Sequence, residues 1–122
     1  MANNELSKAG DADIARYLDR AEVLKDTTAQ LTKDLAQPEE GFALPTLGET
    51  AFEELRGQVL PVLEGLSERG AHSLQVAMYR VDIPEAHMRR TMAQGGLPAL
   101  AGECVLRALQ KVLTRMRFAG RF

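Results

Sequence analysis

The sequence predicts an all-α protein: a compact bundle of about five helices, with a long N-terminal helix and a largely buried C-terminal helix. Apolar residues recur at the three- and four-residue spacing of amphipathic helices, and no alternating apolar–polar stretch is long enough to predict a strand. Prolines and glycines fall between the periodic segments. We expect residues 1–10 to form a flexible tail and residues 11–122 a single helical domain.

The first helix is predicted over residues 11–36, with Asp11 and Asp13 as candidate N-caps. A loop is predicted at about residues 37–48, because two prolines and two glycines interrupt the pattern there. The large apolar residues of this loop are expected to anchor it on the core; they are Phe42, Leu44 and Leu47.

The second helix is predicted from Glu49 or Thr50 to Gly70, where Thr50 and Glu53 have the spacing of a capping box. A third, shorter helix is predicted over residues 71–81, since Leu74, Met78 and Val81 share one face.

Residues 82–85 predict a tight corner between helices. Asp82 can cap the fourth helix, Pro84 is tolerated in its first turn, and Glu85 can complete a capping box. This fourth helix is expected over about residues 84–94, ending at the adjacent Gly95 and Gly96.

The fifth helix is predicted from residues 97–98 to about residue 118. Its apolar residues cover well over half of its circumference, which predicts burial by several neighbours or by a second subunit. We therefore expect this helix to be the centre of the fold.

The net charge of −2 hides an asymmetry between the two halves of the chain. Residues 1–70 carry 7 Lys/Arg against 14 Asp/Glu, a net charge of −7, whereas residues 71–122 carry 8 against 3, a net charge of +5. The halves either attract each other within one fold or present two faces to two partners, and the sequence leaves both alternatives open.

The residues that usually carry chemistry form no recognisable catalytic or metal-binding pattern. His72 and His87 are the only histidines, and neither has an Asp, Glu, His or Cys three or four residues later within its own predicted helix. Cys104 lies on the apolar arc of the fifth helix and is expected to be an inert packing residue. His87 and Glu103 are the least implausible acid–base pair, but they lie in different predicted helices.

Basic side chains near the C-terminus are the strongest candidate contacts for a polyanion. They are Arg107, Lys111, Arg115, Arg117 and Arg121. Two structural explanations compete with nucleic-acid binding. Cations at a helix C-terminus complement the helix dipole, and cations can also pair with the acidic first helix.

Four short segments of the C-terminal half carry a resemblance to a known group of proteins. They are residues 79–83 (YRVDI), residues 76–78 (VAM) before them, Glu85 after them, and residues 109–112 (LQKV). The C-terminal half resembles a group of short, uncharacterised bacterial proteins. These have a leucine-rich helical stretch, a YRIDV-like segment followed by an acidic residue, and a basic-ended final helix. The resemblance implies a small bacterial helical protein and no particular activity.

The sequence therefore predicts a non-enzymatic helical module for protein–protein interaction: an adaptor, an accessory subunit or a self-associating regulator. The alternative is a small protein that binds nucleic acid or another polyanion. We expect a cytoplasmic location, a protein partner or a homo-oligomer, no cofactor, no bound metal and no membrane association.

Overall fold

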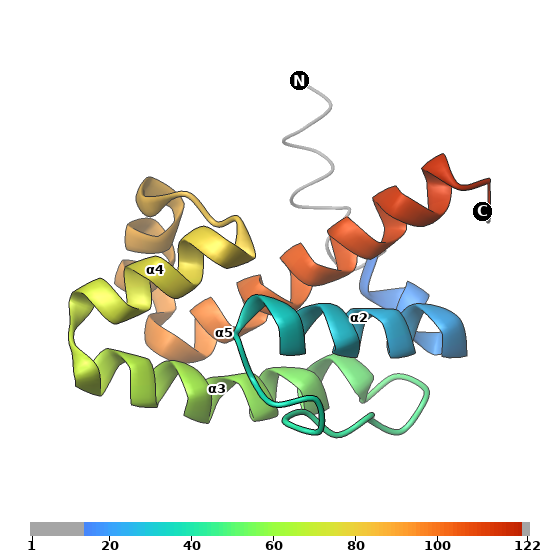
Figure 1. Ribbon diagram of the computed structural model, residues 1–122, viewed down its shortest axis with the longest axis horizontal. Coiled ribbons are helices and arrows are strands. Elements are labelled where there is room, and N and C mark those ends of the chain that lie inside the picture. Colours follow the sequence, from blue (N-terminus) through green and yellow to red (C-terminus); the bar gives the residue numbers. More distant parts are fainter. Residues whose placement is uncertain (1–13, 121–122) are drawn as a thin grey trace.

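The computed structural model describes residues 14–120, and every regular element in that range is helical (Figure 1). The elements are η1 (Arg16–Asp19), α2 (Ala21–Asp34), α3 (Ala51–Arg69), α4 (Ala71–Val81) and α5 (Glu85–Phe118). The predicted all-α class is confirmed, but the predicted count of about five helices is not. The described residues contain four α-helices, because the predicted fourth and fifth helices both belong to α5.

The long helix α5 lies at the centre of the fold and contacts α2, α3 and α4 (Figure 1). Its buried apolar residues are Met88, Leu100, Ala101, Cys104, Val105, Ala108, Leu109, Val112 and Met116. Complete burial of a side chain such as Leu109 contributes roughly 2 kcal/mol to folding. All but one of these buried residues lie after Gly96, in the C-terminal part of α5.

A kink at Gly96 divides α5 into a first arm (residues 85–95) and a second arm (residues 97–118). Gly96 has φ 66° and ψ −158°, a conformation essentially restricted to glycine. Pro98 lies in the first turn of the second arm, where a missing backbone N–H costs little. The sequence thus located the interruption correctly, and the structure shows a kink there.

The predicted N-terminal helix is interrupted at Arg20, so the prediction of one continuous helix over residues 11–36 is wrong. Arg20 has an extended backbone (φ −99°, ψ 124°) between η1 and α2. This break reorients the chain, so that Leu18 and Val23 are both buried although a continuous helix would place them on different faces. The candidate caps Asp11 and Asp13 lie outside the described residues.

Neither predicted capping box forms. Asp82 adopts a left-handed conformation (φ 75°) that ends α4, and Pro84 occupies the N-cap position of α5 without a side-chain hydrogen bond. Two backbone bonds close the end of α4, from Ile83 N to Met78 O (2.9 Å) and from Asp82 N to Tyr79 O (3.1 Å).

At the start of α3, Thr50 makes no side-chain cap; its hydroxyl donates to the Glu54 carboxylate at 2.6 Å. The long side chain of Glu54 thus competes for the hydroxyl that a capping box would direct to the backbone.

Residues 14–120 include no helix with the length and apolar character that crossing a bilayer requires.

Candidate functional site

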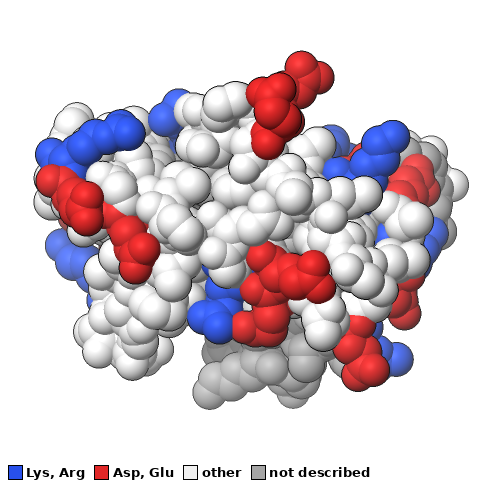
Figure 2. Space-filling model, turned by 90° about the horizontal axis from the view of Figure 1, so that it is seen from below, with Lys and Arg blue, Asp and Glu red and all other residues white. Residues whose placement is uncertain are grey.

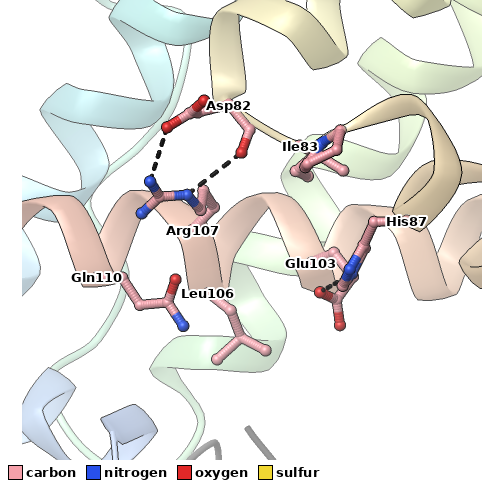
Figure 3. A pocket seen from close by; sticks show the side chains of 8 residues that line it. Asp82, Ile83, His87, Glu103, Leu106, Arg107 and Gln110 are labelled. Carbon is pink, nitrogen blue, oxygen red and sulfur yellow. Dashed lines mark hydrogen bonds and ion pairs between the residues drawn. The ribbon is translucent and has the colours of Figure 1, made fainter. Parts of the chain in front are cut away.

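A cleft of about 320 Å³ lies at the corner between α4 and α5 (Figure 3). Its lining residues are Asp82, Ile83, Pro84, His87, Glu103, Leu106, Arg107 and Gln110. The last four of these share one face of the second arm of α5, at the three- and four-residue spacing that aligns side chains on a helix. The corner and the first arm supply the other lining residues, so the cleft depends on the kink and on the end of α4.

The kink in α5 brings His87 and Glu103 together in this cleft (Figure 3). His87 Nε2 lies 2.8 Å from Glu103 Oε1, and their side chains are 42% and 31% exposed. When Nε2 carries the proton, it donates to the carboxylate, and Nδ1 is left as an acceptor. The sequence named these residues as the least implausible pair but did not predict their contact. The relevant signal was the Gly95–Gly96 interruption, which lies between the two residues.

A second polar contact closes the other end of the cleft. Arg107 Nη2 donates to Asp82 Oδ2 at 2.7 Å, and Arg107 Nε donates to the Asp82 carbonyl oxygen at 3.3 Å (Figure 3). The guanidinium thereby attaches the left-handed residue at the α4 terminus to the second arm of α5. Both side chains are partly exposed, so this contact orients the corner more than it stabilises the fold.

The side chains of the cleft can orient a ligand and accept a proton, but they supply no hydroxyl, thiol or amine nucleophile. Within residues 14–120, no group of three or more His, Cys, Asp or Glu side chains could hold a metal ion. Cys104 is fully buried beside Met78 (Sγ to Sδ, 3.9 Å), and burial raises the pKa of its thiol to about 12. This agrees with the packing role expected for Cys104.

Two of the predicted polyanion contacts are engaged with the acidic half of the chain. Lys111 Nζ donates to Asp34 Oδ2 at 2.9 Å, and the Asp34 side chain is 8% exposed. Arg115 Nη1 donates to Gln30 Oε1 at 2.7 Å, and Gln30 Nε2 donates to Asp34 Oδ1 at 2.9 Å. This polar bridge joins α5 to α2, so attraction between the two halves occurs within one fold.

The other predicted contacts are distributed differently. Arg107 lies in the cleft with Asp82. Arg117 is exposed near the end of α5, and Arg121 lies outside the described residues. Of the four predicted contacts that lie within residues 14–120, three therefore contact acceptors in the same chain.

The loop before α3 forms a second candidate surface. Phe42 is buried as expected, but Leu44 and Leu47 are 60% and 50% exposed, so the prediction that they anchor the loop is wrong. Hydrogen bonds between α3 side chains and the loop backbone anchor the loop instead. Gln58 on α3 accepts from Ala43 N (2.7 Å) and donates to Ala43 O (2.9 Å).

Glu54 on α3 provides the second attachment of this loop. Its Oε1 accepts from the backbone N of Thr46 at 3.1 Å. The hydrogen bonds from the Thr50 hydroxyl and from the Thr46 amide lower the pKa of Glu54 below its ordinary value of 4.5. The loop is thus held by three hydrogen bonds to α3 while its two leucines face solvent.

No family model, no curated protein and no solved structure matches this chain.

Proposed function

We propose that this protein is a non-enzymatic protein–protein interaction module that binds through Leu44 and Leu47. Together with the five glutamates of residues 35–55, these leucines are called the loop surface below. In this proposal the module acts in the cytoplasm, without a cofactor and without a membrane. The cytoplasm is consistent with the single cysteine, which is buried and free, because disulfides are rare in that compartment.

The observation that carries the proposal is the exposure of two leucines on an attached loop. A free loop loses conformational entropy when it binds, whereas a loop already held by Gln58 and Glu54 loses less. Apolar side chains in such a preorganised position gain from being covered by a partner, because burial removes their surface from water.

The test is affinity capture from an extract of the native host, with and without a change to the loop surface. The variant Leu44→Glu plus Leu47→Glu is expected to recover at least about 10-fold less of the wild-type partner. Val76→Glu is the matched control, because Val76 is an exposed apolar residue on α4 (41%). Circular dichroism checks that each variant is folded. Equal recovery by the loop variant and the control would contradict the proposal.

The His87–Glu103 contact favours a second candidate function: binding a small ligand in the cleft, with His87 accepting a proton. A carboxylate-oriented imidazole is an arrangement used for proton transfer, and the same cleft holds Arg107 at its other end. The two histidines make this easy to test by NMR, and His72→Gln assigns the two sets of ring resonances. Addition of acetate, phosphate or an alkylamine should shift the His87 ring protons in the wild type but not in Arg107→Gln. Unchanged shifts with all three probes would remove this candidate.

The structure offers less support for polyanion binding by residues 107–121, because Arg107, Lys111 and Arg115 already contact acceptors in the same chain. A polyanion would have to compete with those acceptors. Retention on heparin that decreases in Arg115→Glu plus Arg117→Glu would restore this alternative, since phosphate- or sulfate-type binding depends on those cations.

A further inference from the structure

We infer that the loop surface binds the C-terminal end of α5 from a second copy of this chain, so that copies associate head to tail. The inference rests on the proposed interaction function and names the partner. The C-terminal end meant here comprises Arg117 and Phe118, and is called the basic tip below.

The basic tip combines an exposed aromatic ring with positive charge. Phe118 is the last residue of α5, and it is 85% exposed. Residues 104–122 carry five Lys/Arg and no Asp or Glu. Arg107, Lys111 and Arg115 contact acceptors in the same chain, whereas Arg117 is exposed beside Phe118. Exposed aromatic and arginine side chains of this kind are enriched at the energetically important centres of protein interfaces.

The loop surface has the complementary chemistry. Residues 35–55 carry five glutamates, and two exposed leucines lie among them. Glu53 pairs with Arg56 at 2.6 Å, and Glu54 accepts from Thr46 and Thr50, so Glu39, Glu40 and Glu49 are the glutamates offered to a partner. Viewed from the α3 side, acidic and basic groups both lie around a broad area without charged side chains (Figure 2). An aromatic ring placed on Leu44 and Leu47 would bring the neighbouring Arg117 towards these glutamates, which favours the correct orientation during association.

One molecule cannot join its own two surfaces. The C-terminal end of α5 and the loop before α3 lie on opposite sides of α2 in Figure 1. The basic tip must therefore reach the loop surface of another copy. Such a contact is heterologous, so repeated use generates chains or closed rings in place of a two-fold dimer.

The decisive experiment uses two variants, each with one surface disabled. The loop variant is Leu44→Glu plus Leu47→Glu, and the tip variant is Arg117→Glu plus Phe118→Glu. Analytical ultracentrifugation of the wild type should show a mass that rises with concentration and falls with added salt. Each variant alone should be a monomer. An equal mixture should form one-to-one dimers and nothing larger, because it retains one intact basic tip and one intact loop surface.

The matched control is Tyr79→Glu. Tyr79 on α4 is 84% exposed, almost the same as Phe118, and its replacement should leave self-association unchanged. Phe118→Ala alone should weaken association by roughly 30-fold, the effect of losing an aromatic anchor.

A wild type that stays monomeric at about 500 μM, far above the micromolar range of ordinary specific contacts, would overturn the inference. So would two variants that fail to dimerise when mixed. Either result leaves the capture experiment free to identify a different partner, so failure of this inference is distinguishable from failure of the proposed function. Loss of host partners in the loop variant, together with a monomeric wild type, would assign the loop surface to a different protein.

Discussion

Replacing Lys111 with methionine tests the polar bridge between α2 and α5. Lys111 Nζ donates to Asp34 Oδ2 at 2.9 Å and to the Arg80 carbonyl oxygen at 3.3 Å. The side chains of Asp34 and Lys111 are 8% and 20% exposed. Methionine is similar in length but carries no charge, so a buried carboxylate would keep only the Gln30 amide as a side-chain donor among the described residues.

The expected loss of unfolding free energy is about 2–3 kcal/mol. Removing one partner of a fully buried ion pair costs roughly 3–5 kcal/mol. The value here is lower, because the remaining Gln30 bond and partial access of water both help to solvate Asp34. For a chain of this length, such a loss lowers the midpoint of thermal unfolding by roughly 10 °C.

Urea denaturation followed by circular dichroism measures this loss in a double-mutant cycle. Asp34→Leu plus Lys111→Met removes both charges and should recover most of the loss, because no buried charge is then left unpaired. The interaction energy from the cycle is expected to be at least about 1.5 kcal/mol.

The control is Arg89→Met, which breaks the Arg89–Glu85 contact at 3.3 Å between side chains that are 69% and 59% exposed. That change should cost no more than about 0.5 kcal/mol. If Lys111→Met costs no more than Arg89→Met, the interpretation of Lys111 and Asp34 as a buried bridge is refuted.

Three local features lead to further measurable expectations. Ala36 has a left-handed backbone (φ 53°) at the end of α2, so Ala36→Gly should gain about 1 kcal/mol in unfolding free energy, whereas Ala29→Gly in the exposed middle of α2 should lose about 1 kcal/mol. Urea denaturation measures both changes in unfolding free energy, and changes of the same sign would contradict the left-handed conformation of Ala36.

Because the pKa of Glu54 is lowered on folding, its contribution to stability is present above pH 4.5 and lost as the pH falls through the lower folded value. The Thr46 amide resonance should therefore shift below pH 4.5 in the wild type and stay constant in Glu54→Gln; a matching shift in both would exclude the contact. Finally, burial raises the pKa of Cys104 to about 12, so the native thiol should resist a disulfide reagent at about pH 8 and react after unfolding. Rapid labelling of the native protein would contradict this.

Helix positions were predictable wherever local chemistry decided them. The third helix was expected over residues 71–81 and is observed there, because its apolar spacing is local and Gly70 separates it from α3. The second helix was expected between residues 49 and 70 and extends from Ala51 to Arg69. Packing also followed local pattern in α5, whose wide apolar arc required several neighbours.

Side-chain partners were not predictable in the same way. Thr50 and Asp82 each had the correct spacing for a capping box, yet their side chains contact Glu54 and Arg107. Glu54 is only four residues away, but Arg107 approaches Asp82 through tertiary packing. A motif specifies which hydrogen bonds a residue can make, and the packed structure decides which acceptor or donor is closest.

The sequence by itself determined that this chain forms helices, where α3 and α4 begin and end, and that α5 is interrupted near Gly96, since these depend on residues within a few turns of one another. The tertiary structure alone decided that His87 meets Glu103 and that Leu44 and Leu47 face solvent. Both outcomes depend on where distant segments pack, and periodicity along one helix carries no information about which other segment will cover it.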